Sequence, residues 1–253
     1  MLTATEISLY LDRIGFSGEP AANLSTLCCL QRCHLFSVPY ETLDIMNGVP
    51  LDLSPAALFD KIVRRRRGGY CFELNALFGE LLSSLGFDVR LHFARYLRGE
   101  KDIPKRRHEV LTVQFPEGRF LCDVGVGAPI PLCPVELSSR RQAQERGIWC
   151  FREDHILGHV LCEEKDGELS DVYAFTDEHC FPQDFLTTSF FCEAHPDSFF
   201  RQGLMVALRT EEGRNTVSGR EFRLFRGDSA EVFTPETEAD FRTALKTYFG
   251  LEY

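Results

Sequence analysis

One nine-residue stretch, Arg67-Gly-Gly-Tyr-Cys-Phe-Glu-Leu-Asn75, constrains this chain more than any other. Its two adjacent glycines allow a tight turn, and they make positive φ angles available without steric cost. From Cys71 to Gly86 the apolar residues recur at helical spacing, which predicts a helix that begins at Cys71. A thiol in the first turn of a helix lies at the positive end of the helix dipole, which favours the thiolate. Cys71 is therefore a candidate nucleophile, and the alternative is a buried cysteine that acts only as a small apolar side chain.

A cysteine nucleophile needs a base, and the base needs a group that orients it. His108 opens an apolar run that ends at Phe115, and a second run from Arg119 to Val124 follows the turn residues 116–118. This pattern predicts a hairpin that can place His108 beside Asp123. An aspartate inside an apolar strand is costly unless it is paired, and the His108 imidazole would be such a partner.

With these residues the chain resembles the arylamine N-acetyltransferases. The resemblance extends over most of the chain, and the ordered set of motifs is more specific than any one of them. The matching segments are Tyr10–Gly15, His34–Leu43, Arg67–Asn75, the strand-opening His108, Asp123–Gly127, Tyr173–Phe175 and His195–Phe199.

The resemblance implies a papain-like catalytic triad of Cys71, His108 and Asp123. It also implies transfer of an acetyl group from acetyl-CoA, through an acetyl-cysteine, to an arylamine or arylhydrazine, with no metal. Coenzyme A is expected at Gly125, Val126, Gly127 and Ser198, and the amine acceptor at Tyr40, Phe72 and Val126. Two positions depart from the family pattern. Thr42 stands where the family usually has asparagine, and Val126 replaces an aromatic residue, which puts the preference for aromatic amines in doubt.

Composition fits an ordinary globular enzyme, with 44% hydrophobic and 26% charged residues in 253. A net charge of −10 argues against nucleic acid or an anionic membrane as the main partner. The N-terminus lacks the pattern of a signal peptide, and no apolar run approaches the length of a membrane span. The ten cysteines lie mostly in apolar periodic stretches, so we expect reduced thiols and a cytoplasmic location. We also expect a monomer or a weak homo-oligomer.

The periodicity predicts an α+β protein with three packed parts in one compact unit. Residues 1–86 read as a helical segment that carries the nucleophile, with helices beginning after Thr3, at about Leu24 and after Ser54. Residues 87–190 read as strands, which the resemblance makes an antiparallel β-barrel carrying His108 and Asp123. Residues 191–253 are expected to form an α/β lid that finishes with a helix from Thr234 or Pro235.

Other constellations favour structural roles. Cys28, Cys29 and Cys33 suit core packing better than a metal cluster, and His155 with His159 lies in a strand-like region without the glutamate of a zinc motif. Arginines 64–67 are interpreted as a solvated face, with a phosphate site as the alternative. Glu41 and Glu73 are flanked by apolar residues, so we expect buried hydrogen bonding from both.

Two rival functions remain open from the sequence. The same triad could serve amide synthesis, peptide hydrolysis or transglutamination. A binding module without activity is also conceivable, although the complete set of Cys71, His108 and Asp123 argues against it.

Overall fold

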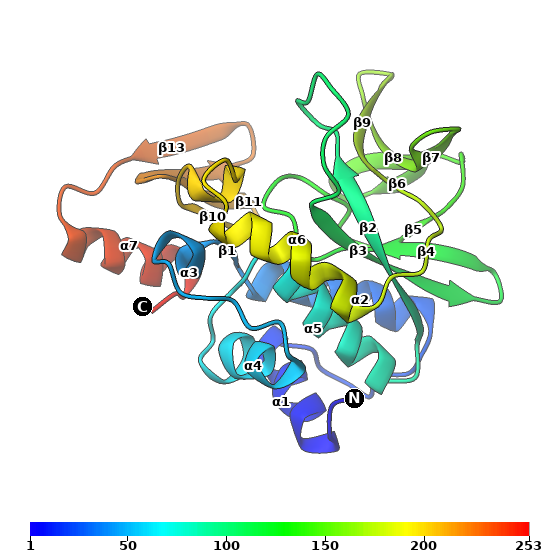
Figure 1. Ribbon diagram of the computed structural model, residues 1–253, viewed down its shortest axis with the longest axis horizontal. Coiled ribbons are helices and arrows are strands. Elements are labelled where there is room, and N and C mark those ends of the chain that lie inside the picture. The colour runs from blue at the N-terminus through cyan, green and yellow to red at the C-terminus, as the bar shows by residue number, and fades with distance from the viewer. Residues whose placement is uncertain (253) are drawn as a thin grey trace.

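The computed structural model describes residues 1–252, which form helices and two antiparallel sheets (Figure 1). The helices are α1 (Ala4–Ile14), α2 (Leu24–Ser37), α3 (Leu43–Met46), α4 (Pro55–Phe59), the π-helical turn η1 (Asp60–Arg64), α5 (Cys71–Ser84), α6 (Pro182–Ala194), the 3₁₀ turn η2 (Phe199–Arg201) and α7 (Glu238–Phe249). The strands are β1 (Tyr40–Glu41), β2 (Asp88–Tyr96), β3 (His108–Phe115), β4 (Gly118–Cys122), β5 (Val135–Glu136), β6 (Gln142–Gln144), β7 (Gly147–Asp154), β8 (Gly158–Lys165), β9 (Glu168–Phe175), β10 (Met205–Thr210), β11 (Gly213–Ser218), β12 (Glu221–Arg226) and β13 (Ser229–Phe233).

The helix starts follow local sequence signals. Thr3 and Glu6 form a capping box at α1, which ends at Gly15 in the left-handed conformation. The Ser54 hydroxyl caps α4, with Pro55 in its first turn. These features were predicted from the sequence and are confirmed.

The larger sheet has eight strands in the order β5-β4-β3-β2-β9-β8-β7-β6. It curls into a nearly closed barrel, so that Phe151 N–H of β7 donates to Ser138 O just beyond β5. Helix α5 packs against β2 and β3, and its buried leucines and Phe78 join the main core. This packing brings the start of α5 next to the start of β3, where His108 lies.

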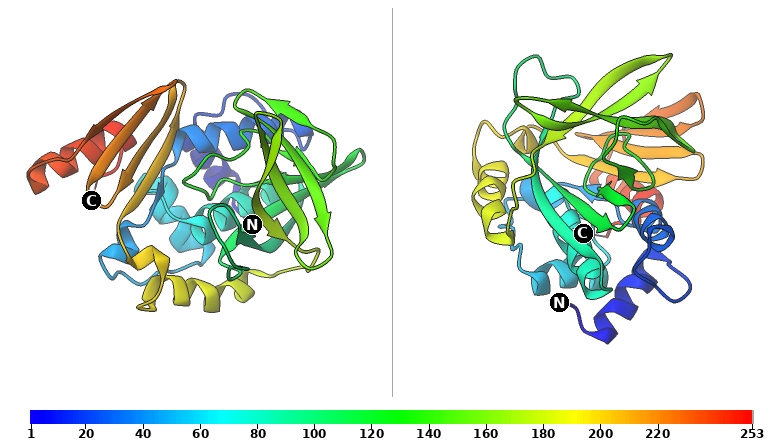
Figure 2. Two further views of the ribbon diagram at one scale, coloured as in Figure 1. Left: turned by 90° about the horizontal axis from the view of Figure 1, so that it is seen from above. Right: turned by 90° about the vertical axis from the view of Figure 1, so that its right-hand side faces the viewer.

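The smaller sheet has five strands in the order β1-β10-β11-β12-β13, and α7 covers it with Phe241, Leu245 and Phe249 (Figure 2). Strand β1 comes from the N-terminal helical part, yet it pairs with β10 of the C-terminal part, Tyr40 opposite Ala207. Backbone hydrogen bonds therefore join the N-terminal helical part to the C-terminal sheet.

Several sequence-based expectations differ from the structure. Helix α6 was not predicted, and the expected division near residue 190 falls inside it. Strands β11 and β13 were also not predicted. The interpretation of arginines 64–67 as one solvated face is wrong for Arg67, which is buried and ion-paired to Glu41.

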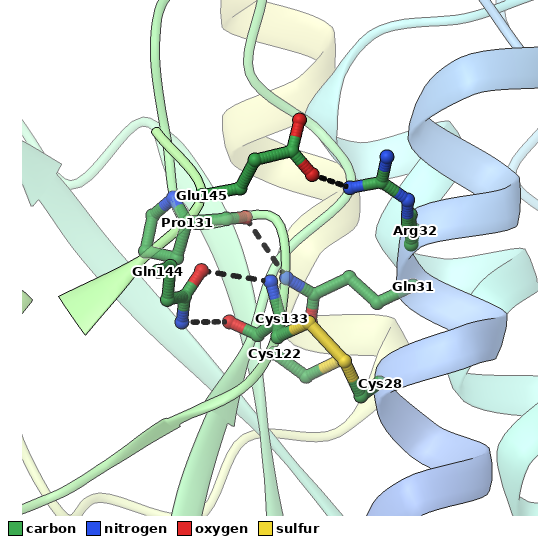
Figure 3. The surroundings of a disulfide bond; sticks show 8 residues. All are labelled: Cys28, Gln31, Arg32, Cys122, Pro131, Cys133, Gln144 and Glu145. Atoms are coloured by element: carbon green, nitrogen blue, oxygen red, sulfur yellow. Dashed lines mark hydrogen bonds and ion pairs between the residues drawn. A yellow bond between two sulfur atoms is a disulfide. The ribbon is translucent and has the colours of Figure 1, made fainter. Parts of the chain in front are cut away.

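The expectation that all cysteines are reduced is also wrong for one pair. Cys28 of α2 forms a disulfide with Cys133 in the loop before β5 (Figure 3). Around it, Gln31 donates to Pro131 O at 3.0 Å, and Gln144 bonds both backbone groups of Cys133. Two thiols placed on different elements cannot be paired from sequence spacing, because the pairing depends on how α2 packs on this loop.

Within residues 1–252, none of the helices has the length and apolar composition needed to cross a bilayer.

Candidate active site

Cys71 is the first residue of α5, and the glycine turn before it is fixed by close packing. A Cβ added to Gly68 would lie 2.0 Å from the Pro39 carbonyl oxygen, and one on Gly69 would lie 2.9 Å from the Glu73 side chain. Neither glycine has positive φ, whereas Arg66 does, with φ 53°. The glycines are thus required for close approach of the backbone, and the expected use of positive φ is wrong.

A buried ionic network holds this turn. Arg67 Nη2 lies 2.7 Å from Glu41 Oε1 and 2.9 Å from Asp44 Oδ1. Lys61 Nζ lies 2.7 Å from both Asp44 and Glu73. Glu73 also accepts from Tyr70 N–H and Glu41 from Leu43 N–H, so both carboxylates have the buried hydrogen-bonding roles predicted for them.

His108 and Asp123 meet across the hairpin as predicted, with His108 Nε2 2.8 Å from Asp123 Oδ2. The other carboxylate oxygen, Oδ1, accepts from Gly125 N–H at 2.8 Å and from Asn75 Nδ2 at 2.9 Å. Asn75 is on α5, one turn beyond Cys71, and its Oδ1 accepts from Val124 N–H. The Tyr173 ring packs against the imidazole at 5.3 Å between centroids. The aspartate is therefore held on both oxygens, and the imidazole has a fixed orientation.

The loop after Asp123 packs directly on the nucleophile. A Cβ on Gly125 would lie 2.7 Å from Cys71 Cα and 2.6 Å from Asn75 Nδ2. Gly127 has more room, since an added Cβ would lie 3.1 Å from Tyr40 and 3.3 Å from Ala207. Only small residues allow this loop to cross over the start of α5.

A cavity of about 320 Å³ opens in front of these residues. Cys71 and His108 both line it, together with Tyr40 and residues 125–128. Its other walls come from segments distant in the sequence, which are Tyr96, Arg107, Phe199, Phe200, 205–207, Thr216 and Val217. The lining is mainly apolar with few polar groups, as is usual for a small-molecule site.

Burial raises the pKa of the Cys71 thiol well above its ordinary value, and the nearby Cys192 adds to this. This burial opposes the thiolate that the helix start is expected to favour. The thiol donates to Arg107 O at 3.7 Å. Desolvation outweighs the helix dipole here, so a thiolate needs an adjacent proton acceptor.

The structure brings most of the predicted site residues together. Cys71, His108, residues 125–127 and Tyr40 line the cavity, and Asp123 lies behind His108. Ser198 does not line it, because its hydroxyl is buried and bonds Cys192 O and Phe200 N–H at the start of η2. Phe72 points away, into an aromatic cluster with Tyr70, Phe93 and Phe185.

Sequence reasoning missed Asn75 as the residue that positions Asp123, and it missed Arg107 and Phe200 as cavity walls. Asn75 closes the motif that contains Cys71, and Phe200 directly follows the His195–Phe199 motif, so both had a signal in the sequence. The cavity-lining residues 205–207 of β10 had no such signal, because their sequence has no motif that marks a site.

Among residues 1–252, no group of three or more His, Cys, Asp or Glu side chains is placed to hold a metal ion. His159 instead lies 2.6 Å from Glu153 and 3.1 Å from Asp177.

Comparison with known proteins finds relatives over nearly the whole chain. A family model described as N-acetyltransferase matches residues 23–253. The chain is 36% identical to the arylamine N-acetyltransferase of Mycolicibacterium smegmatis, covering 98% of this chain and 93% of that protein. It is also similar to the solved structure of the M. tuberculosis arylamine N-acetyltransferase, with TM-score 0.90, 35% identity, and 97% and 94% of the two chains covered. The Mycobacterium marinum arylamine N-acetyltransferase in complex with CoA gives TM-score 0.89 and 35% identity, with 96% and 92% covered.

Proposed function

The chain belongs to the arylamine N-acetyltransferase family and is an acetyltransferase, and from that premise we propose that Cys71, His108 and Asp123 are its catalytic triad. The observation that carries the proposal is the 2.8 Å bond between His108 Nε2 and Asp123 Oδ2 beside a thiol in the same cavity. Because Asp123 engages Nε2, Nδ1 is the ring nitrogen left to take the proton from Cys71. Asp123 fixes this tautomer and stabilises the imidazolium.

The reaction proceeds in two halves. The Cys71 thiol gives its proton to His108, and its sulfur attacks the thioester carbonyl of acetyl-CoA, so that coenzyme A leaves and takes a proton. An amine then attacks the acetyl-cysteine, His108 receives the amine proton, and the Cys71 thiol is restored with release of the amide. Since α5 begins at Cys71, the Cys71 N–H has no acceptor within the helix and is one donor for the oxyanion.

The coenzyme A site is proposed at the cavity mouth beside residues 125–127. The M. marinum relative binds CoA, and this chain has the same fold. Arg107 lines the cavity, with its guanidinium 5.5 Å from the Phe199 ring and 2.6 Å from Glu100, and it is a cationic side chain beside the proposed coenzyme A site. Ser198 supports this site only indirectly, since its hydroxyl caps the turn that carries Phe199 and Phe200.

The acceptor site is proposed between Tyr40 and Val126, which face the same cavity. The Tyr40 ring can stack on an arylamine, while Val126 leaves an aliphatic wall. Phe72 is not part of this wall, because it packs on the other side of α5.

A reducing cytoplasmic location also remains a proposal, supported by the eight cysteines that carry free thiols.

The test of the triad is the intact mass of the protein after mixing with acetyl-CoA. One acetyl adduct that maps to Cys71 is expected in the wild type, and none in Cys71→Ser. His108→Gln should form the adduct slowly, and its pH dependence of Cys71 alkylation should differ from that of the wild type, because the proton acceptor of the thiol is gone. The matched control is Cys122→Ser, which removes a buried thiol elsewhere. An adduct on another cysteine, or full transfer by Cys71→Ser, contradicts the assignment.

The test of the acceptor site is Val126→Phe. The added ring should raise kcat/KM for a small aniline relative to a bulky amine such as 2-aminofluorene by about two- to tenfold. The ratio is measured in both proteins at saturating acetyl-CoA. If the ratio is unchanged, Val126 does not line the acceptor site.

A further inference from the structure

A second cavity, of about 220 Å³, lies behind the active site. It is bounded by α5, by β2, and by the segment that leads into α6, and its lining includes Phe72 and Glu109. These residues directly follow Cys71 and His108. On a strand, consecutive side chains point to opposite faces, so His108 enters the first cavity and Glu109 the second. The two cavities are thus separated by the first turn of α5 and the start of β3.

Glu109 is the unexplained group in this second cavity. The residue is only 1% exposed, and within the described part of the chain neither carboxyl oxygen has a hydrogen-bond partner. Burial, with Asp123 nearby, raises its pKa well above the usual range, which favours the protonated carboxyl when no cation is bound. An unpartnered buried carboxyl is destabilising, and an apolar residue of similar size would pack there at less cost. A ligand that donates hydrogen bonds would satisfy it.

The remaining lining indicates which ligand fits. Phe72, Phe181 and Phe185 give aromatic walls, and neither lysine nor arginine is among the lining residues. The one other carboxylate is Glu80, and Asp123 adds negative potential next to Glu109. His179 is the only lining group that can become cationic. The volume is below the range of about 300–1,000 Å³ for drug-sized ligands, so the site suits a single ring.

We propose that this cavity binds a small aromatic cation, a ring bearing an amidine or alkylammonium group, with Glu109 as its counter-ion. The ring packs against the aromatic wall to which Phe72, Phe181 and Phe185 contribute. The cationic N–H groups donate to the Glu109 carboxylate, which releases its proton to solvent as the cation enters. Charge-assisted bonds of this kind are about twice as strong as neutral ones. This cavity is separate from the one that contains Cys71, and its occupancy is measured by ligand binding without an activity assay.

The experiment is calorimetric titration of the full chain with benzamidine and with its uncharged analogue benzamide. The wild type should bind benzamidine at least about tenfold more tightly than benzamide. Glu109→Gln keeps the shape and removes the charge, so it should abolish that difference. Glu80→Gln is the matched control at the other carboxylate and should retain it.

Two further variants distinguish the cavities. Ala76→Leu, at a half-buried position of α5 that lines the second cavity, should block benzamidine, whereas Val126→Phe in the first cavity should not. Near-ultraviolet circular dichroism confirms that each variant is folded. The proposal is overturned if the wild type does not bind benzamidine at millimolar concentration, if Glu109→Gln binds it equally well, or if Val126→Phe alone removes binding.

Discussion

Gly125 shows how narrow the steric tolerance is around the proposed nucleophile. Its Cα faces Cys71 Cα and the Asn75 amide, and its N–H donates to Asp123. One residue therefore contacts the nucleophile, the residue that positions the aspartate, and the aspartate itself. Any side chain there displaces the loop from all three.

We predict that Gly125→Ala lowers kcat/KM by about 10²-fold, because a shift of about 1 Å in a catalytic group can have that effect. Stability should fall by about 1–3 kcal/mol from overpacking. Gly127→Ala is the control, since its Cβ contacts of 3.1 and 3.3 Å allow small adjustments. Steady-state kinetics and urea unfolding measure both effects. Equal losses in the two variants would contradict this account.

His34 gives the protein a pH-dependent stability. It is fully buried, its Nε2 bonds Tyr10 Oη at 3.0 Å, and burial lowers its pKa to about 3 from an ordinary 6.5. Between these values the unfolded chain binds a proton that the folded protein does not. His34 therefore makes the free energy of unfolding decrease as pH falls from 6.5, by up to about 1.4 kcal/mol per pH unit.

We predict that His34→Gln removes this contribution, so that stability falls less steeply between pH 6.5 and 4.5. The control is His155→Gln, because His155 is exposed. The measurement is urea unfolding at several pH values for the three proteins. A variant slope equal to that of the wild type would show that His34 does not remain neutral.

For single residues, the sequence predicted the role of a side chain better than the packing around it. The pairing of His108 with Asp123 followed from hairpin alternation, which depends on neighbours in the chain. The sequence did not predict that the pKa of Cys71 is raised or that Phe72 points away from the cavity. Both depend on what packs against α5. The need for Gly68 was visible in the sequence, but its cause, the Pro39 carbonyl, lies 29 positions earlier.

The elements differ in how strongly the sequence specifies them. Helix α1 begins with a capping box, and helix α5 follows a glycine turn and has apolar residues at helical spacing, so the starts of both were predicted. Helix α6 has apolar side chains on several sides, with Leu186 and Phe190 exposed and Phe185 buried, and its periodicity is weak. Strand β13 is an edge strand with four of five residues exposed, so it lacks the alternation that marks a strand.

Strand β1 is held by the ion pair between Glu41 and Arg67, which joins it to the glycine turn before α5. We predict that Glu41→Gln lowers stability by about 3 kcal/mol, because Arg67 loses its more deeply buried carboxylate partner and keeps only Asp44. Glu221→Gln in β12 breaks the exposed pair with Arg223 and should cost less than about 1 kcal/mol. Chemical denaturation of both variants makes the comparison. Similar losses would mean that burial of the Arg67 pair has no special effect.

The whole molecule is held together by contacts between segments far apart in the sequence. The β1–β10 pairing joins residues 40–41 to 206–207, and the disulfide joins Cys28 to Cys133. The α+β class and the helical and barrel segments were predicted. These two long-range links were not, because neither has a local pattern.

We predict that the double variant Cys28→Ser/Cys133→Ser is less stable than the wild type by about 5 kcal/mol under oxidising conditions. The bond closes a loop of 105 residues, and the chain-entropy account gives about this value for such a length. Cys29→Ser, at an exposed free thiol, is the control. In reductant the difference should disappear. A difference that persists in reductant would assign the loss to packing.

The same bond means that one polypeptide can exist as two covalent species. Glutathione in a cytosol would keep Cys28 and Cys133 as thiols, whereas air during purification would join them. A purified sample can then differ in heat resistance from the protein in the cell without any change of sequence. Trapping the thiols with an alkylating agent at the moment of lysis would show which species the organism uses.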